Sequence, residues 1–359
     1  MLPYFLLVIL PLLAWCISPK YRITLNRKTL SETTTLPIDF FMLIFLLIIG
    51  LRGLKCGTDT VQYENLFSQY GRMTLDQIFR SYDHELGFKL LCKAIHLITG
   101  NFQVFIAVTA FLCVMPLWYF YRHESEIQLL TIALFLGVAP FSMYVSGIRQ
   151  AISMSIGIFA WYAARDRKLI RYLSIVFLAL QFHNSAFMLF VLYPLYGAKI
   201  TKRWLWFVIP GIIFVYAFRT EIFGYLLRFL WKEYESTPET GAMTILFLLI
   251  IFSVYCYIMP DEKRMDQDCI AMRNILLLSV TIQIFAMLHP LSMRMNYYFL
   301  IFLPILMPKI AKRSKSGLSQ LSRLSVSVMT IYFIYFFLKN GINDNDALNI
   351  FPYIPFWQN

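Results

Sequence analysis

Apolar windows of about 15–22 residues recur along the whole chain, and each is long enough for one helix to cross a bilayer. Hydrophobic residues fill 59% of the 359 positions and charged residues only 14%, a balance that excludes an ordinary soluble domain. We therefore predict an all-α polytopic membrane protein that forms a single integral membrane domain over residues 1–359.

The net charge of +12 is unevenly distributed. Basic residues gather in short loops between the apolar windows, as expected for loops that stay on the cytoplasmic side of a membrane. This distribution argues against a nucleic-acid partner, which would require a continuous basic surface.

Length and charge together predict about twelve transmembrane helices. Ile127–Ala164 would be about 57 Å long as one helix, nearly twice the hydrocarbon thickness, so it must turn back. Leu169–Gly197 has basic clusters on both sides, which also favours a hairpin with both ends in the cytoplasm. The expected spans are 2–17, 36–51, 102–121, 127–146, 148–164, 169–182, 185–198, 204–219, 242–259, 274–289, 295–308 and 324–339. Both chain ends then lie outside, and most of the 32 lysines and arginines lie inside.

Three outer segments are large enough to contribute to function: residues 52–101, 219–241 and 340–359. The first contains Leu86–Ile98, an amphipathic stretch too short and too charged to span, which we expect to lie along the membrane surface. The third ends in aromatic residues suited to the lipid headgroup layer.

Polar clusters interrupt three of the apolar stretches and are expected at outer hairpin tips: 147–150, 182–185 and 289–294. They would deliver Arg149, His183 and Arg294 to one face. A planar guanidinium suits a pyrophosphate, with which it forms paired hydrogen bonds, and an imidazole can move a proton or donate a hydrogen bond. Gln150 stands beside the first arginine. Tyr297 and Tyr298 would offer aromatic walls for a sugar.

Two further groups lie in the first outer segment. Glycines there, including Gly57, free the backbone to turn, and Arg52 supplies a fixed charge near the headgroups. Polar side chains in the same loop can bind sugar hydroxyls: Thr58, Asp59 and Tyr63. Glu85 opens the amphipathic stretch, where apolar surroundings would raise its pKa and make it a general base.

Each of these groups also has a purely structural interpretation. The loop at 57–59 can cap a helix, and Arg149 or Arg294 can reach to lipid phosphate as an anchor. His183 can cap a turn, and Glu85 can favour a helix start. The expected convergence on one face is what favours function. The six cysteines provide neither a disulfide framework nor a zinc-binding spacing, and no cofactor or metal is expected.

In this order, the motifs resemble those of EpsG-family membrane proteins, which are similar to Wzy-type polymerases of O-antigen, capsule and exopolysaccharide. The resemblance covers most of the chain. Its motifs are Arg52-…-Gly57-Thr58-Asp59-Thr60-…-Tyr63-…-Phe67, Glu85-Leu86-Gly87-Phe88, Arg149-Gln150-Ala151, Phe182-His183-Asn184-Ser185-Ala186, Arg294-…-Tyr297/Tyr298 and Pro352-Tyr353.

The resemblance implies a GT-C-like glycosyltransferase of the bacterial inner membrane that needs no metal and inverts the sugar configuration. Its expected partners are oligosaccharide on undecaprenyl pyrophosphate, membrane lipid and a chain-length regulator. Arg149 and Arg294 would hold the pyrophosphate at the periplasmic face, and Arg52 would guide the headgroup. His183 or Glu85, with Asp59 third, would take the proton of the acceptor hydroxyl.

Three other functions remain open. A flippase or exporter of the same lipid-linked oligosaccharide would also need a basic crevice, although transporters usually show internal repeats. A ligase that joins finished polymer to a lipid would share the chemistry and differ in its acceptor. A membrane O-acyltransferase would need its histidine to reach a cytoplasmic donor.

Overall fold

The computed structural model describes residues 2–18, 22–25, 28–31, 35–138, 140–230, 242–343 and 348–358. Three parts of the expected outer segments, 231–241, 344–347 and 359, therefore lie outside the described residues.

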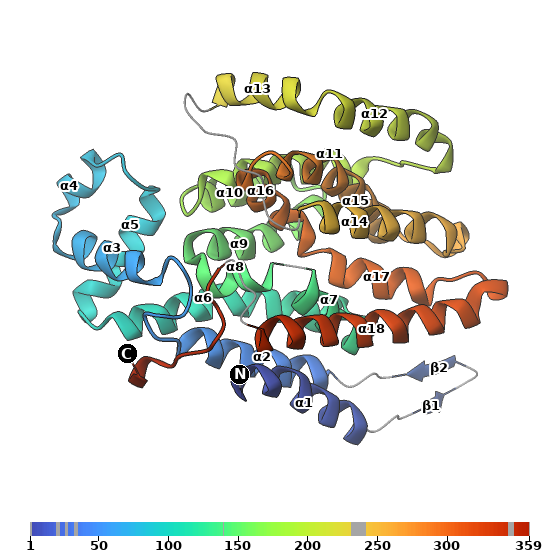
Figure 1. Ribbon diagram of the computed structural model, residues 1–359, viewed down its shortest axis with the longest axis horizontal. Helices are drawn as coiled ribbons and strands as arrows, with labels where there is room; N and C mark the ends of the chain where they lie inside the picture. The colour runs from blue at the N-terminus through green and yellow to red at the C-terminus, as the bar shows by residue number, and fades with distance from the viewer. Residues whose placement is uncertain are drawn as a thin grey trace.

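The described chain is helical apart from one two-stranded hairpin, which confirms the expected helical class (Figure 1). The α-helices are α1 Leu2–Ile17, α2 Leu36–Gly50, α3 Thr60–Arg72, α4 Leu75–Arg80, α5 Leu86–Ile98, α6 Phe102–Glu124, α7 Gln128–Gly137, α8 Phe141–Ser146, α9 Ile148–Arg165, α10 Leu169–Leu180, α11 Leu192–Gly197, α12 Leu205–Ala217, α13 Arg219–Leu230, α14 Ala242–Ile258, α15 Gln267–Ala286, α16 Pro290–Leu300, α17 Leu303–Lys312 and α18 Ser319–Ile342. The 3-10 helices are η1 Asn184–Val191, η2 Lys202–Trp204, η3 Glu262–Arg264, η4 Ser316–Leu318 and η5 Phe356–Gln358. Strands β1 Arg22–Leu25 and β2 Lys28–Ser31 pair in antiparallel register.

Several of these helices have the apolar character of membrane spans. Among the described residues, α6, α15 and the stretch Ser316–Ile342 are long and apolar enough to cross a membrane. A fourth span results if Lys202–Ala217 and Arg219–Leu226, which meet at a 77° bend, are counted together. Helices α1, α2, α7, α10 and α14 are apolar but shorter. This composition is consistent with a membrane protein, and the number of twelve spans stays a prediction.

Several expected spans differ in detail from the helices found, and the span predicted at 295–308 is divided between α16 and α17. The span predicted at 127–146 is divided into α7 and α8, because Pro140 has no N–H for a continuous helix. The span predicted at 185–198 is 3-10 helix η1 followed by α11. The placement of Arg294 at a hairpin tip was wrong. Helix α16 already begins at Pro290, since proline favours the first helical position.

Helix α9 is the central element of the bundle. It packs against α6, α8, α10, α11, α16 and η1. Its small residues allow this close approach: a Cβ on Gly157 would lie 2.9 Å from Leu189 of η1. Most of its side chains are buried, so its two ends are held in fixed positions for the groups described below.

Two groups of helices lie outside this centre (Figure 1). Helices α3, α4 and α5 form one group at the left of the view, and α5 has the bounds expected for the amphipathic stretch. Helices α12 and α13 form the other group along the top, and no residue of α12 is buried.

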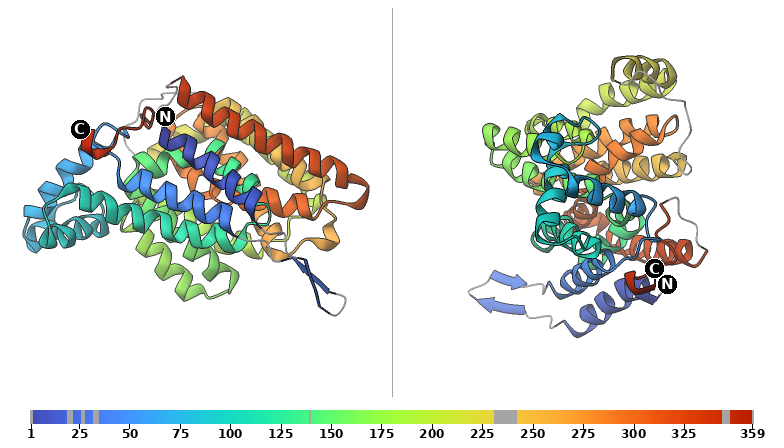
Figure 2. Two further views of the ribbon diagram at one scale, coloured as in Figure 1. Left: turned by 90° about the horizontal axis from the view of Figure 1, so that it is seen from below. Right: turned by 90° about the vertical axis from the view of Figure 1, so that its left-hand side faces the viewer.

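Residues 348–358 return to the beginning of the chain (Figure 2). The Tyr4 hydroxyl donates to the carbonyl of Ile350 at 2.6 Å, and the Gly53 N–H donates to that of Ile354 at 2.8 Å. Within the aromatic run, Phe351 is buried against the protein and Trp357 is exposed, and the headgroup placement of the run stays a prediction.

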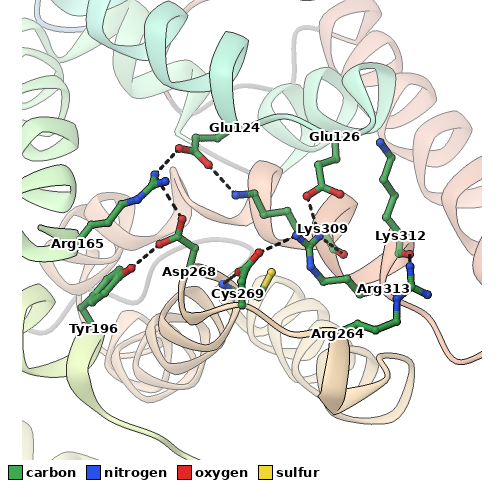
Figure 3. A network of polar contacts seen from close by, with 11 residues as sticks. Glu124, Glu126, Arg165, Tyr196, Arg264, Asp268, Cys269, Lys309, Lys312 and Arg313 are labelled. Atoms are coloured by element: carbon green, nitrogen blue, oxygen red, sulfur yellow. Dashed lines mark hydrogen bonds and ion pairs between the residues drawn. The ribbon is translucent and has the colours of Figure 1, made fainter. Parts of the chain in front are cut away.

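An ion-pair network joins four helices at the end of α9 that the charge pattern predicts to be cytoplasmic (Figure 3). Arg165 in the last turn of α9 pairs with Glu124 of α6 at 2.7 Å and with Asp268 of α15 at 3.4 Å. Lys309 of α17 pairs with the same Glu124 at 2.7 Å. The network continues through Arg313, Glu126, Asp266 and Tyr196. We call these eight residues the inner network.

Candidate functional site

The three predicted clusters meet at the opposite end of α9. Arg149 and Gln150 lie in its first turn, His183 lies in the turn before η1, and Arg294 lies on α16. The Gln150 side chain donates to the carbonyl of Arg294 at 2.5 Å. Helix η1 packs against both α9 and α16. The convergence expected from the sequence is therefore present in the structure.

Glu85 lies at the centre of this cluster. Its Oε2 accepts a hydrogen bond from Arg149 at 2.6 Å, and its Oε1 accepts one from the backbone N–H of Asn184 at 2.9 Å. The side chain of Glu85 is 7% exposed and that of Arg149 is 22% exposed. One carboxylate thus ties α5 to α9 and to the turn that carries His183. We call Glu85, Arg149, His183 and Arg294 the outer cluster.

Gly87 explains how α5 can place Glu85 so deeply. The Phe88 N–H donates to the carbonyl of Gln181 at 3.1 Å. A Cβ on Gly87 would lie only 2.8 Å from that same carbonyl oxygen. Glycine is therefore required for α5 to touch the turn after α10. The Glu85-Leu86-Gly87-Phe88 motif contained this signal, but the sequence alone assigned Gly87 no role.

The loop around Gly57 is clamped against the start of α9. Gly57 has a φ of +91°, which favours glycine, and its Cβ position lies 3.1 Å from the Cα of Ser146. The Thr58 and Ser146 hydroxyls lie 3.0 Å apart. On the other side, Gly57 N–H and Thr58 N–H donate to the carbonyls of Asn349 and Leu348. The loop is therefore a fixed wall beside the outer cluster, with Thr58 exposed.

The other residues predicted for the first outer segment are more buried than expected. Asp59 precedes α3 without a side-chain capping bond, and its carboxylate accepts from the Thr58 hydroxyl at 3.2 Å. Tyr63 of α3 is only 4% exposed, and its hydroxyl interacts electrostatically with Arg149. Tyr63 therefore belongs to the support of Arg149, and in this conformation it does not present its ring to a sugar.

Arg52 does not lie at the surface where we expected it. It is 1% exposed, and its NH1 donates to the carbonyl of Ile49 at 3.3 Å. Among the described residues, its Nε and NH2 have no hydrogen-bond partner. The burial arises because its backbone forms a β-bridge with Pro355, so the returning segment covers it. The expected surface position was wrong, and a role in headgroup entry stays a hypothesis.

Tyr297 and Tyr298 differ in what they can contact. Tyr297 is half-buried. Tyr298 is fully buried, and its hydroxyl is hydrogen-bonded to Ser185 of η1 at 3.2 Å and to Ser153 of α9 at 3.0 Å. Tyr298 therefore fastens the His183 turn to α9, which contradicts its expected place as an aromatic wall.

The pKa values of Glu85 and His183 in the cluster are both shifted from their ordinary values. Burial raises the pKa of Glu85, but the charge of Arg149 and the N–H of Asn184 outweigh this and hold it below its ordinary value. Burial lowers the pKa of His183 to about 4, and the charges of Arg149 and Arg294 act in the same direction while Glu85 opposes them. At neutral pH the cluster therefore contains a carboxylate, two guanidinium cations and a neutral imidazole.

The arrangement suits an anionic ligand rather than a metal ion. Within the described ranges, no group of three or more His, Cys, Asp and Glu side chains could hold a metal. Arg294 is exposed, and no ion pair of its side chain occurs in the described part of the chain. Arg149 has a buried Nε without a hydrogen-bond partner there. Both arginines can thus donate hydrogen bonds to a further anion.

Comparison with known proteins gave one result. The model of the EpsG family matches residues 36–354, which include every residue of the outer cluster. No curated protein and no solved structure matches the chain.

Proposed function

Because the chain belongs to the EpsG family, a membership that indicates a membrane protein of polysaccharide biosynthesis, we propose that it is a repeat-unit polymerase. The donor is a growing glycan on undecaprenyl pyrophosphate, and the acceptor is the non-reducing end of one lipid-linked repeat unit. The proposal includes a GT-C-like bundle of about twelve spans in a bacterial inner membrane, with the outer cluster facing the periplasm.

The single observation that carries this proposal is the meeting of Arg149, Arg294, His183 and Glu85 at one end of α9. When the glycosidic bond to a pyrophosphate breaks, negative charge develops on the bridging oxygen. Arginines aimed at that position stabilise the charge and can replace a metal ion.

The reaction follows from these positions. The acceptor hydroxyl attacks the anomeric carbon of the donor from the face opposite the pyrophosphate, so the configuration inverts. Glu85 or His183 takes the hydroxyl proton. The electron pair of the breaking bond moves to the pyrophosphate oxygen, which Arg149 and Arg294 bind. Thr58, Asp59 and Tyr297 line the approach for the sugars.

The inner network favours a polymerase over a flippase. Alternating access requires both ends of the bundle to open. Glu124 and Lys309 are largely buried and paired, and Arg165 joins α6, α9 and α15 at that end. In this conformation the ion pairs hold the bundle closed at that end, which favours a site that takes its substrates from the other end. A ligase shares the outer-cluster chemistry and is separated from a polymerase by its product.

Surface polysaccharide from a strain lacking this chain tests the proposal. We expect short products of one repeat unit in the deletion strain, and long chains after complementation with the wild type. Arg149→Ala and Arg294→Ala should restore no long chains and should accumulate single lipid-linked repeats. Arg80→Ala, an exposed arginine paired with Asp76 on α4, is the matched control and should restore long chains.

Other gel patterns would identify the alternatives. Polymer that accumulates on the carrier lipid in the deletion strain would indicate a ligase. Repeat units retained inside the cell would indicate a flippase. Full-length polymer from both arginine variants would remove the assignment of the outer cluster. Polysaccharide from the same strains can also be used to determine its sugar composition and to test for a chain-length regulator.

A further inference from the structure

We infer that Glu85 is the base of the transfer reaction and that its ion pair with Arg149 delays it until the donor has bound. The inference rests on the proposed function. In the free protein, Arg149 covers Glu85. When the donor pyrophosphate arrives, Arg149 moves to it, and the uncovered carboxylate receives the proton of the acceptor hydroxyl.

The hydrogen bonds of His183 exclude it as the base in this conformation. Its Nδ1 accepts from the backbone N–H of Ser185 at 3.2 Å, and the Ser185 hydroxyl lies 2.6 Å from the same nitrogen. A neutral imidazole whose Nδ1 accepts carries its proton on Nε2. The free nitrogen of His183 is therefore an N–H, which can donate a hydrogen bond to an oxygen but cannot take a proton.

Glu85, unlike His183, can offer an oxygen that takes a proton. Its Oε1 is held by the N–H of Asn184 at 2.9 Å, and its Oε2 by Arg149 at 2.6 Å. If Arg149 leaves, the Asn184 contact still orients the carboxylate. Oε2 then becomes the free acceptor, adjacent to the turn that carries His183. Asp59, the third candidate, already accepts from Thr58 and lies before α3.

Arg149 is suited to exchange partners. Only one of its terminal nitrogens is in the ion pair, and its Nε is buried without a partner among the described residues. Its guanidinium lies 5.7 Å from the centroid of the Phe88 ring, and the Tyr63 hydroxyl of α3 interacts with it electrostatically. These contacts hold the cation near the carboxylate while leaving donors for phosphate oxygens.

Because Arg149 must move to the donor before Glu85 is uncovered, the donor must bind before the acceptor can react. With the ion pair intact, Arg149 keeps Glu85 ionised but weakly basic, as the lowered pKa indicates. Transfer of the guanidinium to the donor removes that effect and adds a nearby anion, both of which make the carboxylate more basic. The acceptor oxygen then bonds to the anomeric carbon, its proton passes to Glu85, and undecaprenyl pyrophosphate leaves with the electron pair.

The test uses the purified full-length protein with two measurements. The first is single-turnover transfer with lipid-linked repeat units. The second is calorimetric binding of geranyl pyrophosphate, a soluble prenyl pyrophosphate. Glu85→Gln should slow transfer by about 10²–10⁴-fold, as for loss of a general base. The same variant should bind geranyl pyrophosphate several-fold more tightly, because the ligand no longer competes with a carboxylate for Arg149.

Asp83→Asn is the matched control, since it neutralises an exposed carboxylate two residues away and should change neither measurement. Glu85→Gln with transfer near the wild-type rate would refute Glu85 as the base. Slow transfer with weakened geranyl pyrophosphate binding would refute the exchange, because that result is expected if Glu85 only supports Arg149. Wild-type protein that forms no polymer would instead refute the proposed function.

His183→Asn supplies an independent test should Glu85→Gln fail to fold. The asparagine oxygen can accept from the Ser185 N–H and keep the cap. The base remains, so we expect transfer to fall by no more than about tenfold. A loss as large as that expected for Glu85→Gln would overturn the assignment of roles.

Discussion

The two ends of α9 both carry arginines, but their surroundings differ. At the inner network, Arg165 meets two carboxylates, and the buried Lys309 is paired with Glu124. At the outer cluster, one carboxylate, Glu85, faces Arg149, while Arg294 is exposed. Charged side chains that are all paired with one another can hold helices together but have no charge left for a ligand. A set with excess positive charge remains available to a ligand, and this contrast is the reason why we propose the outer cluster as the functional site.

Among the variants that compare the two ends of α9, Arg294→Ala should have the largest effect. We expect a fall in transfer of about 10²–10³-fold, because a cation at the developing negative charge is lost. The thermal unfolding midpoint should stay near that of the wild type, since the side chain is exposed. Single-turnover transfer and thermal unfolding of the same preparation check both points. A large loss of stability would remove the contrast between the two ends.

Gly87→Ala should come next. The added Cβ would lie 2.8 Å from the carbonyl of Gln181 and push α5 away from the turn, which moves Glu85 from Arg149. A displacement of about 1 Å can cost roughly 10²-fold in rate. Transfer assays measure the loss. Gly224→Ala on α13 is the control, because nothing lies within 4 Å of its Cβ position.

Lys309→Ala should lower stability and leave the transfer rate unchanged, which is the reverse of the pattern expected for Arg294→Ala. It leaves the buried carboxylate of Glu124 with Arg165 alone, which we expect to cost about 1–3 kcal/mol of stability. The rate per folded molecule should remain unchanged, because the outer cluster is at the other end of α9. Lys312→Ala, an exposed neighbour, serves as the control. A loss of rate without loss of stability would show that the two ends are coupled.

The smallest effect concerns pH. The pKa of Glu85 is lower in the folded protein than its ordinary value near 4.3, so its ionised form stabilises the fold. This contribution is present above about pH 4.3 and is lost as the pH falls through the folded pKa. The difference in unfolding midpoint between wild type and Glu85→Gln should therefore shrink below about pH 4. A difference that is constant with pH would contradict the ion pair.

Local patterns predicted much of this arrangement. The alternation of apolar and polar residues defined α5 as Leu86–Ile98, and basic flanks with excess length brought Arg149, His183 and Arg294 to one end. Pro290 could have predicted the start of α16, because proline favours the first helical position. This boundary is therefore encoded in the local sequence.

Contacts between residues far apart in the sequence could not be predicted from local patterns. The burial of Arg52 depends on Pro355, about 300 residues later, and local sequence says nothing about that pairing. The engagement of Tyr298 depends on Ser153 and Ser185, which belong to two other elements. The pairing of Glu85 with Arg149 likewise required the close packing that Gly87 permits.

The returning segment has a consequence for how the protein matures. The Gly57 loop is held between Ser146 and the carbonyls of Leu348 and Asn349. A nascent chain inserts its early helices while those later residues have still to be translated. The wall beside α9 therefore gains its second support only after nearly all of the bundle is in the bilayer. A protein assembled in this order has no finished outer cluster until synthesis has passed residue 349.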